Sequence, residues 1–336
     1  MPELAPPELI VITGSDARKH LEAARPECAD VVRRAYLTHA AGDSALPHSS
    51  FLRFPARERD RIIALPGYLG GEFDVAGIKW IASVPGNTGH GLPRASAVLL
   101  LNDPATGFAY ACMESSLISA TRTAGSAVLA AEALTGGRTA RRIGFVGTGL
   151  IADHVRRFFA DLSWEVGGYR LFDTDPAAAH RFAGRLTGAD VVVADDVSGA
   201  FEDCDVVVLA TVAGTPHLHD PALLAHRPVV LHLSLRDLGE DLVLGAQNFT
   251  DDIDHVMRER TSLHLAEQRV GHRGFVAGTL ADVLTGTVSR DPGRAAVFSP
   301  FGLGVLDLAV GSWLAERVRA AGTALPVADF YAEVGR

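Results

Sequence analysis

The sequence predicts an α/β protein that combines a doubly wound parallel sheet with a second, α+β domain. Two observations carry this prediction. The chain has 336 residues, about twice the length of a domain of roughly 150 residues. Residues 138–300 alternate short apolar strand patterns with helical patterns, whereas residues 1–137 contain strands joined by turns rich in glycine, proline and asparagine. The first arrangement is typical of βαβ units and a parallel sheet.

The first domain, residues 1–137, is expected to contain four strands, at 51–54, 78–84, 95–102 and 108–112. Asn102 to Gly107 carries turn residues that favour a hairpin. A helix is expected at 115–134, because small and apolar residues recur there with a period of 3.6, and Gly136 and Gly137 end it. A helical pattern at 305–319 follows the second domain, and we expect residues 301–336 to complete the first.

The second domain, residues 138–300, is expected to begin with a strand at 142–146. Further strands are expected at 168–173, 191–193, 205–210 and 229–233, and helices at 150–162 and 176–186. Pro176 favours a helix start at that point. The run 205–210 contains an unbroken apolar stretch, as expected of a strand buried on both faces of a sheet.

The composition excludes several classes of protein. Hydrophobic residues make up 48% and charged residues 21%, which excludes a disordered chain. The net charge of −9 lacks the basic footprint of a nucleic-acid binder. Apolar runs are too short for a membrane span, the N-terminus lacks a signal-peptide pattern, and three scattered cysteines do not form a disulfide framework. We therefore expect a cytoplasmic protein without nucleic-acid or membrane partners. We also expect no metal, because no acid or cysteine cluster completes a ligand set with His217 and His219.

The clearest motif follows the strand at 142–146. It matches the dinucleotide-binding pattern G-x-G-x-x-A and consists of Gly147, Thr148, Gly149, Leu150, Ile151 and Ala152. The first glycine permits a tight turn, the second lets the backbone approach a pyrophosphate, and the small last residue lets the helix pack on the strand. This pattern predicts a Rossmann domain, although a glycine-rich turn in another α/β sheet remains the alternative.

Two residues at the ends of later strands extend this prediction. Asp173 ends the strand after the motif, where an acid accepts hydrogen bonds from the ribose hydroxyl and repels a 2′-phosphate. NAD is therefore the expected cofactor, in preference to NADP. Thr211 follows the strand at 205–210 and is expected at the same crevice, with an ordinary turn residue as the alternative.

Four cations of the first domain stand in apolar or small-residue surroundings: Arg53, Lys79, Arg94 and Arg122. Lys79 lies between Ile78 and Trp80, where a lysine pays a desolvation cost unless an anion meets it. Each of the four is, by itself, as consistent with a surface group. Together they indicate a pocket for a polycarboxylate.

Several segments resemble the ornithine cyclodeaminase/mu-crystallin family. They are IKWIAS with PGN at 78–87, GFAY at 107–110, ATRTA at 120–124 and GTG at 147–149. Within the family, five further segments are most similar to the diaminopropionate-forming N-(2-amino-2-carboxyethyl)-L-glutamate dehydrogenases of siderophore and peptide-antibiotic pathways. These are GLPRASA at 91–97, ACMESS at 111–116, HLSLRD at 232–237, DDIDHV at 251–256 and TSLHLAE at 261–267. The similarity runs from about Arg53 to Asp307.

The resemblance implies roles for particular residues. Lys79 and Arg122 would bind the substrate carboxylate and take part in catalysis, with Arg53, Arg94 and Ser96 as further substrate-binding residues. Asp237 would be the general acid/base. The implied cofactor-binding residues are Gly147, Thr148, Gly149, Leu150, Ile151, Asp173, Thr211, Ser234, Gly302 and Asp307.

The resemblance also implies an activity and an assembly. The reaction would be the NAD-dependent oxidative hydrolysis of N-(2-amino-2-carboxyethyl)-L-glutamate to L-2,3-diaminopropionate and 2-oxoglutarate, in a homodimer whose first domain binds substrate and dimerises. The alternatives are an ornithine cyclodeaminase, an alanine- or ketimine-type oxidoreductase, or a non-catalytic mu-crystallin-like binding protein. The segment LRDLGE at 235–240 departs from the cyclodeaminase pattern and argues against ornithine cyclisation.

Overall fold

The computed structural model describes residues 6–331, so that residues 1–5, which formed most of the segment searched for a signal peptide, lie outside it. The chain forms two compact units. The first consists of Met1–Arg122 with Leu303–Arg336, and the second of Thr123–Gly302. The division falls inside helix α3 (Ser116–Thr135). The sequence predicts the boundary at residue 137, where Gly136 and Gly137 follow that helix.

The first unit is built on a sheet in the order β18-β1-β7-β6-β5-β4-β2, with β3 paired to β4. Only β1 and β7 run parallel; the other neighbours are antiparallel. The strands are β1 (Leu9–Ile12), β2 (Ser44–Ala45), β3 (Ser50–Phe54), β4 (Arg57–Leu69), β5 (Val75–Ser83), β6 (Ala95–Asn102), β7 (Ala109–Glu114) and β18 (Leu325–Val327). The helices are α1 (Gly14–Ala23), α2 (Arg25–Ala40), the 3-10 turn η1 (Pro85–His90) and α10 (Gly304–Ala320).

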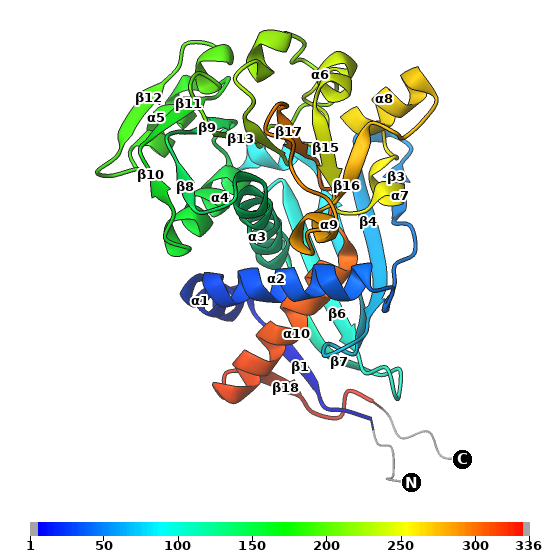
Figure 1. Cartoon of the computed structure of the whole chain (residues 1–336). Helices are drawn as coiled ribbons and strands as arrows, with labels where there is room; N and C mark the ends of the chain where they lie inside the picture. Colours follow the sequence, from blue (N-terminus) through cyan, green and yellow to red (C-terminus); the bar gives the residue numbers. More distant parts are fainter. Residues whose placement is uncertain (1–5, 332–336) are drawn as a thin grey trace. The chain divides into compact units, whose positions relative to one another are not determined.

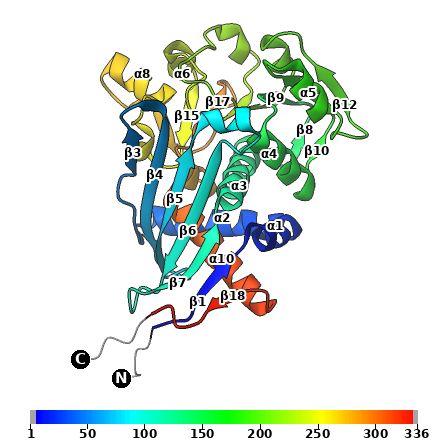
Figure 2. The same cartoon turned by 180° about the vertical axis from the view of Figure 1, so that it is seen from behind.

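One face of this sheet is covered by α10. Along β6, Ala97, Leu99 and Leu101 are buried, whereas Val98 and Leu100 between them are exposed, because side chains of a strand alternate between faces. The helix α10 packs on β4, β5 and β6 and also against α2 (Figure 2). Gly311 permits this close packing, since a Cβ there would lie 2.3 Å from a methyl carbon of Leu99. Within residues 6–331, the two faces of the sheet therefore differ: α10 covers one, and apolar side chains on the other are exposed.

The second unit contains an eight-stranded sheet in the order β12-β11-β9-β13-β14-β17-β15-β16, in which every neighbouring pair is parallel (Figure 1). Its strands are β9 (Ile143–Val146), β11 (Gly168–Phe172), β12 (Asp190–Val193), β13 (Val206–Leu209), β14 (Val229–His232), β15 (Gln247–Thr250), β16 (Val276–Thr279) and β17 (Ala296–Phe298). The strands β8 (Thr139–Ala140) and β10 (Glu165–Val166) form a separate parallel pair. The helices are α4 (Leu150–Asp161), α5 (Pro176–Ala183), α6 (Glu240–Gly245), α7 (Ile253–Val256), α8 (Ser262–Val270) and α9 (Leu280–Leu284), with 3-10 turns η2 (Ser198–Ala200) and η3 (Pro221–Leu224).

This strand order confirms the predicted doubly wound α/β fold. From β9 the chain proceeds to β11 and β12 on one side, whereas β13 and β14 lie on the other side of β9. A crevice for a ligand forms outside the carboxyl ends of the strands at such a switch point. We therefore expect a ligand-binding site at the carboxyl ends of β9, β13 and β14. Among residues 6–331, no helix is both long and apolar enough to cross a bilayer.

Candidate active site

The glycine loop after β9 has the geometry that a dinucleotide requires. Gly147 has φ +85°, and a Cβ on it would lie 2.6 Å from the carbonyl oxygen of Ala210, so only glycine fits this turn. Gly149 caps α4 without a side-chain hydrogen bond, and a Cβ there would meet no atom within 4 Å. The N-terminus of α4 thus has no side-chain cap at Gly149, and such a helix N-terminus binds a diphosphate favourably. The loop fits the predicted cofactor.

Asp173 lies beside this loop, immediately after β11. Its Oδ2 accepts hydrogen bonds from the Thr148 amide at 2.7 Å and the Thr148 hydroxyl at 2.8 Å, and its Oδ1 accepts one from the Asp175 amide at 3.0 Å. Burial raises the pKa of this carboxyl, but the hydrogen bonds from Asp175 and Thr148 outweigh burial and hold the pKa below its usual value. A charged carboxylate next to the glycine loop is what recognition of a ribose requires.

A second cluster lies at the ends of β13 and β14 around Asp237, whose side chain is 0% exposed. Four side chains reach its carboxylate. The hydroxyls of Thr211 and Ser234 donate to it, His217 Nε2 lies 3.0 Å from Oδ1, and His232 Nε2 lies 3.2 Å from Oδ2. The other ring nitrogen of His232 contacts the Ser299 hydroxyl at 3.0 Å. We call Asp237, Thr211, His217, His232 and Ser234 the Asp237 cluster.

The Asp237 cluster keeps its carboxylate charged. Burial raises the pKa of Asp237, but the contact with His232 and the hydrogen bonds from Ser234 and Thr211 outweigh burial and hold the pKa far below the ordinary range of a carboxylic acid. Thr211 and Asp237, predicted separately as a cofactor residue and an acid/base, are hydrogen-bonded to each other. The glycine loop lies at the same edge of the sheet, because Gly147 packs against Ala210, the residue before Thr211.

The first unit holds a buried ionic group where β5, α3 and α10 meet. Lys79 Nζ lies 2.6 Å from Oδ2 of Asp307, and Arg122 Nε lies 3.4 Å from Oδ1. Ser119, one helical turn before Arg122, has its hydroxyl 3.3 Å from Lys79 Nζ. Asp307 stands in the first turn of α10, where the helix dipole favours an anion. Two buried cations therefore share a single carboxylate, and we call these four residues the Lys79 cluster.

Lys79 is unusual for a lysine because it is buried. Burial lowers its pKa to about 8; the nearby Asp307 carboxylate opposes this shift, and Arg122 adds to it. A cation that gives up its proton so readily is stabilised by additional negative charge. Lys79 and Arg122 together are thus suited to bind the carboxylate of a ligand. The charge of Asp307 already neutralises part of their positive charge.

A second group of cations gathers around Ser83, on the same sheet face as Lys79. Arg53 pairs with Arg61 across β3 and β4, and Arg61 pairs with Ser83 across β4 and β5, so these side chains project from one face. Arg94 donates to the Ser83 hydroxyl at 3.2 Å. Ser83 lies four residues from Lys79 along β5, about 13 Å at the rise of a strand. Arg61 was not predicted, because the polar segment that contains it lacks strand periodicity.

The other predicted residues are distributed as follows. Ser96 is not brought to the Lys79 cluster: it pairs with Ala82, one position out of phase with Lys79 and Ser83, and so projects from the opposite face of the sheet. Gly302, with φ +98°, donates its amide to buried Asp251 at 2.6 Å. Asp307, predicted to contact the cofactor, belongs to the first unit and binds Lys79 and Arg122. Leu150 and Ile151 open α4, and Leu150 is largely exposed.

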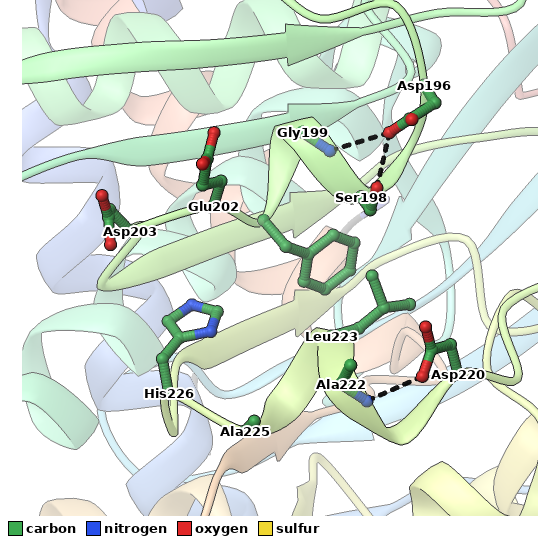
Figure 3. Close-up of a pocket in the computed structure, with 11 residues that line it drawn as sticks. Asp196, Ser198, Gly199, Glu202, Asp203, Asp220, Ala222, Leu223, Ala225 and His226 are labelled. Carbon is green, nitrogen blue, oxygen red and sulfur yellow. Dashed lines mark hydrogen bonds between the residues drawn. The ribbon is translucent and has the colours of Figure 1, made fainter.

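A separate hollow of 540 Å³ lies between η2 and η3 in the second unit (Figure 3). Two of its acidic side chains are occupied by local hydrogen bonds: Asp196 accepts from the Ser198 hydroxyl and the Gly199 amide, and Asp220 accepts from the Ala222 amide. The other two, Glu202 and Asp203, lie 3.7 Å from Arg170 and Arg142. None of the predicted site residues lines it. Within residues 6–331, no group of three or more histidine, cysteine or acidic side chains is arranged to hold a metal.

The parallel sheet, its glycine loop and the adjacent acid define a protein with a dinucleotide-binding Rossmann unit and a second unit that carries buried cations. The chain belongs to the ornithine cyclodeaminase/mu-crystallin family, whose model matches residues 10–322.

Relatives agree with this family assignment along nearly the whole chain. The N-((2S)-2-amino-2-carboxyethyl)-L-glutamate dehydrogenase of Staphylococcus aureus is 26% identical over 83% of this chain and 86% of its own. The Δ1-pyrroline-2-carboxylate reductase of Thermococcus litoralis, solved with NADH and L-proline, superposes with a TM-score of 0.86 at 22% identity, covering 95% of this chain and 100% of the other. An archaeal alanine dehydrogenase dimer with bound NAD gives 0.83 at 23% identity, covering 96% and 100%. The predicted family is confirmed. The solved relatives that share this fold hold NADH or NAD, in agreement with the predicted class of NAD-dependent oxidoreductase and the predicted cofactor.

Proposed function

We propose that the chain catalyses the NAD-dependent oxidative hydrolysis of N-(2-amino-2-carboxyethyl)-L-glutamate to L-2,3-diaminopropionate and 2-oxoglutarate. The diaminopropionate would then serve as a building block for a siderophore or peptide natural product. The proposal is supported by the Staphylococcus aureus relative, whose name carries this substrate, and by the cations of the first unit. The reaction oxidises a CH–NH group to an imine, so the chain would be an oxidoreductase acting on CH–NH groups.

The observation that carries the proposal is the presence of two separate cationic groups on one face of one sheet. Lys79 and Arg122 form one group, and Arg53, Arg61 and Arg94 gather around Ser83, about 13 Å away along β5. Two groups at this spacing suit a substrate with carboxylates at both ends, as this tricarboxylate has. A single small carboxylate, as in alanine or proline, would engage only one of them.

Within this proposal the second unit holds the cofactor. The glycine loop and the amide groups of α4 would bind the diphosphate, and Asp173 the ribose. NAD supplies a hydride acceptor when it is bound. The chain itself orients the substrate by its carboxylates through Lys79 and Arg122, and Asp237 is the predicted group for proton transfer.

The experiment that tests the proposal is a comparison of substrates. Purified protein is mixed with NAD⁺ and N-(2-amino-2-carboxyethyl)-L-glutamate, ornithine, proline or alanine in turn, and absorbance at 340 nm, 2-oxoglutarate and ammonia are followed. We expect NADH and 2-oxoglutarate with the first substrate only. Proline and ammonia formed from ornithine without net NADH would return the chain to the cyclodeaminases. NADH from alanine alone would make it an alanine dehydrogenase.

We also propose that the chain forms a homodimer through the uncovered face of the first sheet. Trp80 and Val98 pair across β5 and β6 and are 43% and 42% exposed, and Leu100 and Leu52 continue this apolar face on β6 and β3. Monomers rarely leave a contiguous apolar sheet face in water. The archaeal relative solved as a dimer supports a second copy as its partner.

Light scattering coupled to size-exclusion chromatography tests the homodimer. Wild-type protein is expected at twice the mass of the chain, and Trp80→Glu at the mass of one chain. Val192→Glu is the matched control, because Val192 is also an exposed strand residue but lies on β12 of the second unit. A monomeric wild type, or a Trp80→Glu protein that stays dimeric, would refute this interface.

A further inference from the structure

The Asp237 cluster contains one titratable side chain that reaches solvent. The His217 side chain is 41% exposed, whereas those of Asp237 and His232 are 0% exposed. Thr211 and Ser234 are part-buried, and their hydroxyl groups donate hydrogen bonds to the carboxylate. His217 is therefore the titratable group of the cluster that a substrate can approach.

Asp237 is poorly suited to carry the proton itself. Its carboxylate is fully buried and is contacted by four side chains, two on each oxygen. To take a proton, it would have to lose hydrogen bonds in a place where water cannot replace them. A carboxylate in this environment more readily fixes and stabilises a neighbouring imidazolium ion.

The backbone holds His217 in place beside Asp237. The amides of His217 and Leu218 both donate to the carbonyl oxygen of Asp237, at 3.0 and 2.9 Å. The ring adds the contact between Nε2 and Oδ1 at 3.0 Å. Because a carboxylate can only accept, Nε2 carries the hydrogen, and the lone pair of the neutral ring is on Nδ1. Among the contacts of residues 6–331, Nδ1 of His217 has no hydrogen-bond partner.

We propose that His217 is the proton-transferring residue of the hydrolytic half of the reaction and that Asp237 is its positioning residue. This inference rests on the proposed function and divides between two residues the role that the family resemblance assigns to Asp237 alone. The charged or titratable side chains that face His217 are Asp237 directly and His232 across that carboxylate.

The chemistry balances with a single proton held by His217. Hydride transfer from the α-carbon of the glutamate part to NAD⁺ leaves a protonated imine. Water forms a C–O bond at this carbon, the C=N π pair moves to nitrogen, and one water proton passes to Nδ1 of His217. The imidazolium returns that proton to the nitrogen, the hydroxyl proton of the carbinolamine is released to solvent, the C–N bond breaks, and the amine leaves as diaminopropionate beside the new carbonyl of 2-oxoglutarate.

Trapping of the imine tests this assignment. His217→Gln is mixed with NAD⁺ and the substrate, NADH is followed at 340 nm, and samples are quenched with sodium borodeuteride. The reagent turns the imine into deuterated secondary amine and 2-oxoglutarate into deuterated 2-hydroxyglutarate. In a single turnover, with enzyme in excess over substrate, we expect NADH to appear at a rate within about threefold of wild type, while 2-oxoglutarate forms at least about 100-fold more slowly, the range of general acid–base effects. Deuterated amine should accumulate in the variant.

His219→Gln is the matched control, because His219 lies two residues further on the same segment and, among the interactions of residues 6–331, forms no hydrogen bond or ion pair with Asp237. It should give the product distribution of wild type. An unchanged distribution in His217→Gln, or the same imine accumulation in His219→Gln, would overturn the proposal. Binding of NADH, measured by its fluorescence, should be equal in both variants and shows that the second unit is folded.

A measurement without substrate separates this inference from the proposed function. In ¹⁵N NMR of the free protein, neutral His217 should carry its hydrogen on Nε2, and Asp237→Asn should lose that preference. A neutral ring with hydrogen on Nδ1 in wild type would refute the positioning role of Asp237. If wild type shows the expected tautomer but makes no NADH from the substrate, the proposed function fails and His217 loses the reaction assigned to it.

Discussion

Replacement of Asp307 by asparagine should lower the free energy of unfolding, because two buried cations lose the carboxylate that they share. Asp307 pairs with both Lys79 and Arg122, and all three side chains are buried. Asparagine keeps the shape but removes the charge. Loss of one partner from a buried ion pair typically costs about 3–5 kcal/mol, because the remaining charge stays desolvated. We expect the free energy of unfolding to fall by about that amount.

The assay is urea unfolding at pH 7 followed by tryptophan fluorescence, which reports on the first unit through Trp80 and Trp313 and on the second through Trp164. For a unit of this size, the expected loss corresponds to a fall in melting temperature of roughly 6–20 °C. Asp254→Asn is the control, since the Asp254 pair with Arg273 is exposed and such pairs contribute about 0–1 kcal/mol. Added glutarate should restore more stability to Asp307→Asn than to wild type.

The addition of glutarate tests whether the Lys79 cluster binds a carboxylate. A free dicarboxylate can occupy the position that the variant leaves without negative charge and so stabilises the folded state by mass action. If Asp307→Asn is as stable as wild type, the two cations are not held by this carboxylate. If glutarate stabilises both proteins equally, the Lys79 cluster is not where a carboxylate binds.

Three further predictions concern pH, cofactor choice and the glycine loop. The pKa of Lys79 is about 8 in the folded chain and 10.5 for a free lysine. Between these two values the unfolded chain binds more protons than the folded chain, so the free energy of unfolding should increase as pH rises from about 8 to 10.5. Below about pH 8 the buried charge of Lys79 destabilises the folded state. Lys79→Met should flatten this pH dependence in urea titrations. Asp173→Ala should lower the ratio of kcat/KM for NAD⁺ over NADP⁺ by about tenfold or more, since repulsion of the 2′-phosphate is lost; an unchanged ratio would exclude Asp173 as the ribose acid. Gly147→Ala should abolish NADH binding in fluorescence titrations and cost about 1–3 kcal/mol of stability, because φ is +85° and Cβ meets Ala210. Gly188→Ala, also at positive φ but with open space around its Cβ, should leave NADH binding intact.

The second unit follows from its sequence more closely than the first. Strands buried on both faces, such as 206–209, appear as unbroken apolar runs and need no partner to be recognised. The longest strand, β4, was missed because it starts with the charged residues RERDR and its apolar half lies beyond them. The helices α1 and α2 were also not predicted. Their exposed faces carry many charged residues, and the buried positions become evident only against α10.

The site could be predicted in its parts but not in its pairings. Lys79 and Arg122 stand out because they interrupt apolar or small-residue segments. Asp307 is 228 residues from Lys79 and looks like an ordinary N-terminal helix acid, so its place between the two cations depends on the tertiary fold. The sequence draws attention to His217 only as a possible metal ligand beside His219. Its contact with Asp237 depends on the tertiary fold, because the carboxylate follows β14.

The discontinuity of the first unit bears on how the chain is made. A ribosome adds roughly 5–20 residues per second, so the 228 residues between Lys79 and Asp307 take about 10–45 s to synthesise. During that interval the strands β4, β5 and β6 exist without the helix that covers them, and Leu99 and Leu101 remain open to water beside two unneutralised cations. The continuous second unit can fold meanwhile. Until α10 is synthesised, the nascent chain thus exposes an apolar sheet face that carries two cations. This is the stage at which the chain is most prone to aggregate and has most need of chaperones.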